Sequence, residues 1–387
     1  MIVMFPWLAL DEPVRLEQFE LLQFKQGLLP AGVKKRKQSL LDRLFRPYQQ
    51  AGKPVQSASL LRFRGHDYLD DLNEAERSEV FSIAELLTIS GLSAREFFGL
   101  GMFYCNSDHF SCVIQTCEST FAGTAITRRR RDGRTLNYVS ANSFRVDKPH
   151  HVGGIMRTRL DLPLLKALMA ARKCDWWENF FEAIFWFNRA NTDSDTITKE
   201  IEAVEIVGAF ERLLGLVGGD ERSLRRAFIE AFVPKEELSC AASRRASIQR
   251  FKGCSSVREA WIADLFRLRG DHSHGWKKPR YPSTWSLDEH LLLAAFAFPL
   301  LAKQLLSTRG LYVPTRNDVA HVSAFEHLAS INPFERPVDS TGNSGSPWTR
   351  ILAESLFKFP KYVDPVTHEP LIDASLLRWG RPPKNRD

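Results

Sequence analysis

A short polar segment in the second half of the chain gathers residue types that could do chemistry at a phosphate. Leu265–Gly275 reads LFRLRGDHSHG and holds Arg269, Asp271, His272 and His274 close together. A histidine titrates near neutral pH and can move a proton to or from a ribose hydroxyl or a leaving oxygen. An arginine stays charged and can hold two phosphate oxygens as negative charge builds in the transition state. The segment therefore predicts phosphoryl chemistry that needs no metal and no cofactor.

The spacing of these residues decides whether they can act together. Arg269 and His274 are five residues apart, so on one continuous helix their side chains would diverge by about 140°. Gly270 and Asp271 offer a helix break and a new cap, which would let the two side chains converge. Convergence with a second copy across a two-fold axis is the alternative. A purely structural interpretation also stands, in which Arg269 pairs with Asp271 and the histidines finish a helix end.

Other catalytic and targeting signatures are absent from the sequence. It has no GxxxxGK[ST] loop, GxGxxG fingerprint, HExxH or GxSxG motif, and no Cys/His spacing typical of zinc. The six cysteines form no CxxC pair and no disulfide framework, which favours a reducing cytoplasm. The apolar start, Met1–Pro13, lacks the basic residues that open a signal peptide. The apolar run Leu291–Ala302 is too short to span a membrane and predicts a buried helix. We therefore expect a cytoplasmic protein with no membrane partner.

The elements that must position the segment fall into three parts. The 387 residues, 44% of them hydrophobic, suffice for two or three domains. Residues 1–158 predict a mixed α/β domain, 159–310 an all-α bundle, and 311–387 a short irregular extension rich in Pro, Gly and Ser. The fold class is therefore α+β. In the first part we expect strands in Ile2–Leu10, Leu60–Phe63 and Phe110–Cys117, and a helix from Asn73 to Ile89 that Gly91 ends.

The helical part shows a start signal before each of five expected helices, which short connections would join into a bundle. Gly218-Gly219 should end the third helix, Pro299 should kink the fifth, and the extension could hold a short helix at Thr349–Phe357. The five start signals are Asp161, Asp175 with Glu178, Ser194 or Asp195, Ser256 with Glu259, and Ser286 with Glu289.

Positive charge is concentrated in two windows. The net charge is +7, but Arg128–Lys148 holds seven basic and two acidic residues, and Arg244–Arg280 holds ten basic and three acidic ones. Two basic zones on a chain that is otherwise slightly acidic predict contact with a polyanion, most commonly a nucleic acid. Solvated loops that aid solubility are the alternative. In the first window, Asp132-Gly133 predicts a hairpin across Ala125–Ser140 with a basic tip. Such a tip can grip a phosphate backbone, or it can protect a sheet edge from aggregation.

Three segments, in order, resemble the HEPN superfamily, and specifically its Apea-like branch. Leu265–Gly275 is similar to the R-x4-H motif of that family, in which an apolar-aromatic pair precedes the arginine and a glycine follows the histidine. Ala183–Ala190 reads AIFWFNRA and is similar to the upstream A-x-x-W-[LF]-N-x-A motif. Ala209–Leu214 reads AFERLL and is similar to the A-[LF]-E-x-L-L motif. The resemblance covers roughly residues 160–310, less than half of the chain.

The resemblance implies an all-α domain that dimerises and brings two R-x4-H motifs into one cleft. Many HEPN proteins are metal-independent endoribonucleases of toxin, CRISPR-linked or antiphage systems. By this resemblance, Arg269 would orient the scissile phosphate and His274 would assist attack by the ribose 2′-hydroxyl. The products would be a 2′,3′-cyclic phosphate and a free 5′-hydroxyl. Glu211 would orient Arg269 or cap the core, rather than act as a base.

The segment departs from the family pattern at three positions. Gly270 stands where a polar residue is common, with Asp271 one place later. His272 stands where an apolar residue is usual, so either His272 or His274 could carry the proton. Trp276 replaces the tyrosine of the R-x4-H-x-Y branch, which argues against regulation by modification of that tyrosine.

We therefore expect a toxin or antiphage-defence endoribonuclease that binds RNA and forms a homodimer through the helical part. The N-terminal part would sense a trigger or bind a protein partner. A non-catalytic HEPN subunit that binds nucleotides or RNA, or serves as a scaffold in a defence complex, is one alternative. A DNA-binding regulator that uses the basic hairpin is another. The predicted catalytic residues are Arg269, His274, His272 and Asp271, and the predicted RNA contacts are Arg128, Arg129, Arg130, Arg131, Arg134, Arg267, Lys277 and Lys278.

Overall fold

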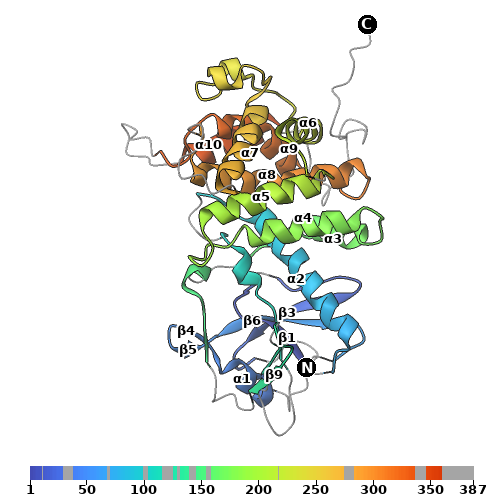
Figure 1. The fold of residues 1–387 in the computed structure, drawn as a ribbon. Helices are drawn as coiled ribbons and strands as arrows, with labels where there is room; N and C mark the ends of the chain where they lie inside the picture. Colours follow the sequence, from blue (N-terminus) through green and yellow to red (C-terminus); the bar gives the residue numbers. More distant parts are fainter. Residues whose placement is uncertain are drawn as a thin grey trace. The chain divides into compact units, whose positions relative to one another are not determined.

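The chain forms two compact units (Figure 1). The first comprises Met1–Glu96 and Gly101–Leu160, and the second comprises Phe97–Leu100 together with the chain from Asp161 onward. Strands and sheets make up most of the first unit, and the second is helical, so the fold is α+β. The computed structural model describes residues 1–10, 12–28, 38–67, 70–98, 103–115, 125–128, 131–138, 145–153, 158–216, 218–273, 283–335 and 346–359.

A five-stranded antiparallel sheet carries the core of the first unit. Its strand order is β2-β3-β6-β1-β7. Alternate side chains along each strand point to the same face, and on one face they pack against helix α1 (Gln38–Phe45), where Phe24 stacks on Phe45 with 4.3 Å between ring centroids. Each predicted strand run contains or overlaps a strand of this sheet. The strands are β1 (Ile2–Phe5), β2 (Val14–Arg15), β3 (Phe19–Lys25), β6 (Ser57–Phe63) and β7 (Val113–Gln115).

Two smaller sheets complete the first unit. One has the order β10-β4-β5 and combines β4 (Tyr48–Gln50), β5 (Lys53–Pro54) and β10 (Val146–Asp147). The other is the hairpin of β8 (Ala125–Arg128) and β9 (Thr135–Tyr138). Gly133, with φ of 68°, lies in its turn, so the hairpin predicted from Asp132-Gly133 is confirmed.

The long helix α2 (Glu74–Ala94) corrects one prediction. Its start carries a full capping box between Asn73 and Glu76. The expected end at Gly91 is wrong, because Gly91 is buried inside the helix. A Cβ atom at this position would lie 2.1 Å from Cζ of Phe110. The glycine is therefore present for close packing against the 3₁₀ turn η2 (Ser107–Phe110), not to stop the helix.

Eight helices are described in the second unit, and α5 packs against α4, α7 and α8. Aromatic side chains fill the core between them: Phe210 meets Trp261 at 6.1 Å and Phe298 at 5.4 Å between centroids. The helices are α3 (Leu162–Ala171), α4 (Trp177–Arg189), α5 (Lys199–Leu213), α6 (Glu221–Ala231), α7 (Val257–Ser273), α8 (Leu287–Thr308), α9 (Arg316–Ala329) and α10 (Pro347–Lys358).

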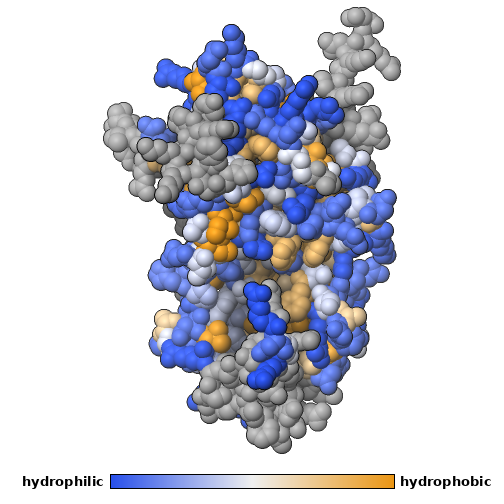
Figure 2. All heavy atoms as spheres, viewed as in Figure 1, coloured by the Kyte–Doolittle hydropathy of each residue, from blue (hydrophilic) through white to orange (hydrophobic). Residues whose placement is uncertain are grey.

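The helix α8 confirms the buried helix predicted around Leu291–Ala302. Among the described residues it is the one helix long and apolar enough to cross a membrane, but 72% of its apolar window is buried within the protein. It therefore serves as a core helix, and Pro299 lies inside it, where the kink was expected. On the face shown in Figure 2, hydrophilic side chains predominate over the described surface, and hydrophobic ones form small groups.

Two helix starts follow the sequence signals and two do not. Asp161 accepts a hydrogen bond from the Leu164 N–H at 3.0 Å, and Ser286 forms its capping box with Glu289, as predicted. The capping pair predicted at Asp175 is wrong: α4 begins after Trp176, with no side-chain cap. The start predicted at Ser194 or Asp195 is also wrong. The hydroxyl of Ser194 bonds to Thr196 in a local turn, so α5 begins only after Thr198.

The end of α5 and the helix that follows it differ from expectation. The helix stops at Leu213, and Gly215, at φ of 71°, leads the chain away before Gly218-Gly219 is reached. The helix α6 was not predicted, although its cap is a usual one: the carboxylate of Asp220 accepts from the Ser223 N–H at 2.7 Å. Its apolar positions Leu224, Ala227, Phe228 and Ala231 follow helical spacing, so the sequence did carry a signal for this helix.

The expectation that 311–387 is short and irregular is wrong for its described residues, 311–335 and 346–359. Helices α9 and α10 pack on each other, and α9 packs on α8. Trp348 is fully buried and meets Phe296 at 5.3 Å between centroids. The helix expected at Thr349–Phe357 is confirmed as α10. Two residues of the Pro-, Gly- and Ser-rich stretch, Ser346 and Pro347, start α10.

Candidate active site

The site residues predicted at the end of α7 depend on how that helix begins. The hydroxyl of Ser256 accepts from the Glu259 N–H at 3.4 Å, and the Glu259 carboxylate accepts from the Ser255 N–H at 2.7 Å. These reciprocal bonds satisfy donors that the first turn would otherwise leave exposed. The start predicted from Ser256 and Glu259 is therefore confirmed.

The helix does not break where a break was expected. It continues through Gly270 and Asp271 to Ser273. A Cβ atom at Gly270 would meet nothing within 4 Å, so the glycine is neither a packing contact nor a turn. A glycine inside a helix costs about 1 kcal/mol relative to alanine, which the packing of the preceding turns outweighs here. Arg269, Asp271 and His272 therefore lie on one continuous helix, and His274 lies outside the described residues.

The two halves of α7 differ in burial. Every residue from Val257 to Leu265 is buried, and from Phe266 to His272 each is only partly buried. The first half anchors the helix in the core, and the second half reaches the surface. Arg269, Asp271 and His272, the described members of the predicted catalytic set, lie in this second half.

Arg269 is held by Glu211, which lies near the end of α5. Its Nη2 donates to Glu211 Oε1 at 2.8 Å, and the side chains are 25% and 12% exposed. The guanidinium also lies over the ring of Phe266, 4.6 Å from the centroid. The Nε of Arg269 is buried and has no hydrogen-bond partner among the described residues. Glu211 is thus in contact with Arg269, as its expected role of orienting Arg269 requires, and this ion pair of Arg269 joins two helices instead of linking it to Asp271.

His272 lies three residues after Arg269, so both side chains lie on neighbouring positions of the helix surface. The histidine also lies near Glu200 at the start of α5. The pKa of Glu200 is lowered by hydrogen bonds from its own backbone N–H and from Thr198, and to a smaller extent by the charge of His272. Within the described chain, the surface end of α7 thus combines a fixed arginine with a histidine one turn away.

The described residues among the predicted RNA contacts belong to both units of the chain. Arg267 makes a two-point ion pair with Glu221 at the start of α6, with both N···O distances 2.7 Å. At the hairpin turn in the first unit, Arg131 and Arg134 are exposed, and the Arg134 N–H donates to Asp132 at 3.1 Å. Nothing in the sequence indicated the partner of Arg267, because the helix that carries Glu221 was not predicted. The predicted residues that lie outside the described side chains are Arg128, Arg129, Arg130, Lys277 and Lys278.

The two upstream motifs meet at the interface of α4 and α5. Trp186 of the first motif lies under the guanidinium of Arg212 from the second, 4.3 Å from ring centroid to Cζ. Phe187 stacks on Phe298 of α8 at 4.2 Å, and Arg189 pairs with the buried Glu205 at 2.5 Å. Burial raises the pKa of Glu205, and the charge of Arg189 opposes that shift. These motif residues therefore pack α4 and α8 against α5, the helix that carries Glu211.

The site was then compared with known proteins. The chain matches no family model, no curated protein and no solved structure. Among the described residues, no group of three or more His, Cys, Asp or Glu side chains could hold a metal ion. The described groups that could act at this site are the Arg269–Glu211 pair and His272.

Proposed function

We propose that the helical unit is a metal-independent endoribonuclease of the HEPN type, which cleaves RNA through attack by the ribose 2′-hydroxyl. One observation carries the proposal: Glu211 fixes Arg269 at the partly exposed end of a rigid helix, one turn from His272. A fixed guanidinium is a preorganised donor for a charged phosphate. The order of the three HEPN-like motifs adds support from the sequence.

The proposed reaction assigns a role to each group. Arg269 donates to the non-bridging oxygens of the scissile phosphate through its partly exposed guanidinium group. Glu211 is a positioning residue that keeps the guanidinium in place. His272 or His274 accepts the proton of the 2′-hydroxyl as that oxygen bonds to phosphorus. The bond to the 5′ oxygen breaks, and the leaving oxygen takes a proton, so a 2′,3′-cyclic phosphate and a 5′-hydroxyl result.

We further propose that the active form is a homodimer through the helical unit. An arginine and a histidine from one helix end supply one of each group. A second copy would supply the second histidine that the leaving oxygen needs. In this proposal the enzyme is a cytoplasmic toxin or antiphage-defence effector, and the first unit regulates its activity by sensing a trigger or binding a protein partner.

A non-catalytic RNA- or nucleotide-binding scaffold is the second candidate. One observation favours it: Glu211 already compensates the charge of Arg269, at 2.8 Å. A substrate phosphate would have to compete with, or share, that carboxylate. In-cell toxicity separates the two candidates, because a nuclease is toxic when overproduced and a scaffold is tolerated.

The test is cleavage of labelled tRNA and total RNA by the purified full chain in the presence of EDTA. We expect cleavage with cyclic-phosphate ends, reduced at least about 100-fold in Arg269→Ala and in the variant of whichever histidine, His272→Ala or His274→Ala, carries the proton. Arg226→Ala, a 79% exposed arginine on α6, is the matched control and should cleave normally.

Each contrary result has a defined meaning. Cleavage that EDTA abolishes, or that Arg269→Ala leaves intact, overturns the proposed mechanism. The scaffold is supported instead if the full chain does not cleave RNA and if neither the full chain nor residues 161–387 harm cells when overproduced.

A further inference from the structure

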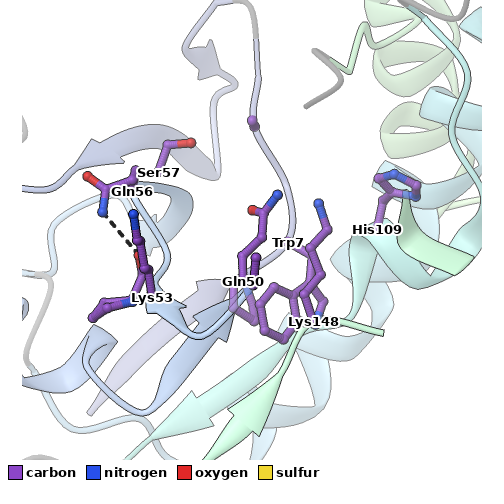
Figure 3. A pocket seen from close by; sticks show the side chains of 11 residues that line it. Trp7, Gln50, Lys53, Gln56, Ser57, His109 and Lys148 are labelled. Atoms are coloured by element: carbon purple, nitrogen blue, oxygen red, sulfur yellow. Dashed lines mark hydrogen bonds between the residues drawn. The ribbon is translucent and has the colours of Figure 1, made fainter. Parts of the chain in front are cut away.

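A pocket of about 550 Å³ opens in the first unit and has no part in the proposed RNA chemistry (Figure 3). Its walls come from the segment after β1, the β4–β5 hairpin, the start of β6, the turn η2 and the residue after β10. This volume lies within the range of about 300–1,000 Å³ that small-molecule sites occupy. The polar side chains that line it are those of Gln50, Lys53, Gln56, Ser57, His109 and Lys148.

Two lysines flank a glutamine across the small sheet of this unit. Gln50 on β4 is paired with Lys53 on β5, and β10 runs parallel to β4 in a register that sets Lys148 level with Gln50. Residues level with one another on adjacent strands face the same side of a sheet, and strands lie about 4.8 Å apart. The two lysines therefore flank the glutamine amide over a span of roughly 10 Å. Figure 3 shows Gln50 and Lys148 extending in the same direction, with His109 beyond them.

The pocket has a positive lining. No Asp or Glu is among the described residues that line it. Loss of water around Lys148 lowers the pKa of its ammonium group. Two ammonium groups on one sheet face attract an anion by Coulomb interaction. The lining therefore favours a negatively charged occupant.

The hairpin that holds these residues is tightly constrained. Ala51 has φ of 50° and Gly52 has φ of 75°, so both central residues are left-handed. This is the conformation that a two-residue type I′ hairpin turn requires. The turn pairs Gln50 with Lys53, and both residues line the pocket.

Part of the pocket lining is apolar and aromatic. Trp7 is only 8% exposed and packs edge-on against Tyr48, with 6.1 Å between centroids. Burial in the core fixes its indole, so the part that lines the pocket is preformed. Next to it, His109 is 4% exposed, and its Nδ1 lies 2.8 Å from Oδ1 of Asn106. An aromatic wall beside cationic side chains suits a molecule that has both a ring and an anionic group.

We propose that this pocket binds a small ring-bearing anion of the nucleoside monophosphate class. The phosphate lies on the row formed by Lys53, Gln50 and Lys148, and the base lies against Trp7. This inference does not depend on the RNase activity of the helical unit, because all of the lining residues belong to the first unit.

Isothermal titration calorimetry on the full chain tests the inference. The probes are the four nucleoside 5′-monophosphates, the four nucleosides and inorganic phosphate. We expect at least one monophosphate to bind once per chain, about tenfold or more tighter than its nucleoside and than phosphate alone. Lys53→Ala and Lys148→Ala should each weaken binding about tenfold, the loss of one charge-assisted contact. Lys166→Ala, an exposed lysine of α3, should bind as the wild type does.

Arg269→Ala separates this site from the proposed nuclease site, because it should abolish RNA cleavage and keep monophosphate binding. Circular dichroism would verify that each variant is folded. The inference is overturned if no monophosphate binds the wild type, or if a folded Lys53→Ala, Lys148→Ala double variant keeps full affinity. Equal affinity for inorganic phosphate and every monophosphate overturns the role of Trp7 and of the ring.

Discussion

The two basic windows of the chain carry similar net charge in the sequence, but their described arginines make different contacts in the fold. In Arg244–Arg280, five arginines pair with carboxylates from elsewhere, at N···O distances between 2.6 and 2.9 Å. In Arg128–Lys148, the described Arg131 and Arg134 are exposed at a hairpin turn. The five pairs are Arg245–Glu289, Arg250–Asp264, Arg258–Glu326, Arg267–Glu221 and Arg269–Glu211.

This difference shows that charge counted along the sequence is not surface charge. Four of the five carboxylates lie outside the second window, and the fifth, Asp264, lies inside it but on another helix from Arg250. Folding brings them to the arginines. Asp264 shows how completely this occurs: it is fully buried, and it contacts Arg250 at 2.6 Å and His290 at 3.3 Å. Much of the positive charge of the second window is therefore compensated within the helical unit, while the described hairpin arginines face solvent.

The largest change in the free energy of unfolding is expected on substitution of Arg258. This arginine is 4% exposed and pairs with Glu326, itself 1% exposed. Arg258→Met would leave a buried carboxylate without its partner, so we expect the free energy of unfolding to fall by about 3–5 kcal/mol. Arg134→Ala in the exposed turn should change it by less than about 0.5 kcal/mol. Urea unfolding measures both, and similar losses in the two variants would contradict the comparison.

Substitution of Arg245 should lower the free energy of unfolding by a smaller amount, and this loss should depend on pH. Burial alone would raise the pKa of Glu289, but the ion pair with Arg245 and hydrogen bonds from Ser286 lower it below its usual range. A lowered carboxyl pKa contributes stability above the ordinary value of about 4.3, and this contribution is lost as the pH falls through the folded-state value. Arg245→Met should therefore cost about 2 kcal/mol at pH 7.

The difference between Arg245→Met and the wild type should then shrink as the pH is lowered toward 3, because a protonated Glu289 no longer needs the arginine. Urea unfolding at pH 7, 5, 4 and 3 measures the trend. A difference that stays constant over this range would show that Arg245 stabilises by packing rather than by charge.

The smallest effect is expected in the salt dependence of RNA binding. If the hairpin contacts phosphates, Arg131→Ala with Arg134→Ala should reduce the slope of log affinity against log salt by about 1.4, or roughly 0.7 for each lost contact with a single strand. Arg226→Ala on α6 serves as the control. Fluorescence anisotropy with a labelled single-stranded RNA measures the slopes, and an unchanged slope in the hairpin variant would assign those arginines to protection of a sheet edge.

Local patterns predicted a good part of the fold. The hairpin at Asp132-Gly133, the caps at Asp161 and Ser286, and the buried helix around Pro299 follow from a few neighbouring residues. Each of these signals is a hydrogen bond or a backbone preference within four or five positions. The expectation that Glu211 orients Arg269 came from a family resemblance, because 58 residues separate the two in the chain.

Other features of the fold could not be predicted from neighbouring residues in the sequence. Gly91 was expected to end a helix, but the ring of Phe110 requires a glycine at that point inside it. Gly270 was expected to break α7, but the buried turns before it keep the helix continuous. In both places a contact from a distant part of the chain, or the packing of a whole helix, outweighs the local preference of one glycine.

The sequence by itself determined where several strands and helices lie, that α8 is buried, and that an arginine, an aspartate and two histidines are close together in the chain. Short-range backbone chemistry and hydrophobic patterning are enough for these. Only the tertiary structure decided which arginines are compensated, that Arg269 faces Glu211, and that Lys53, Gln50 and Lys148 form one row. Charge partners and pocket walls are set by residues far apart in the chain, whose proximity depends on the packing of the whole unit.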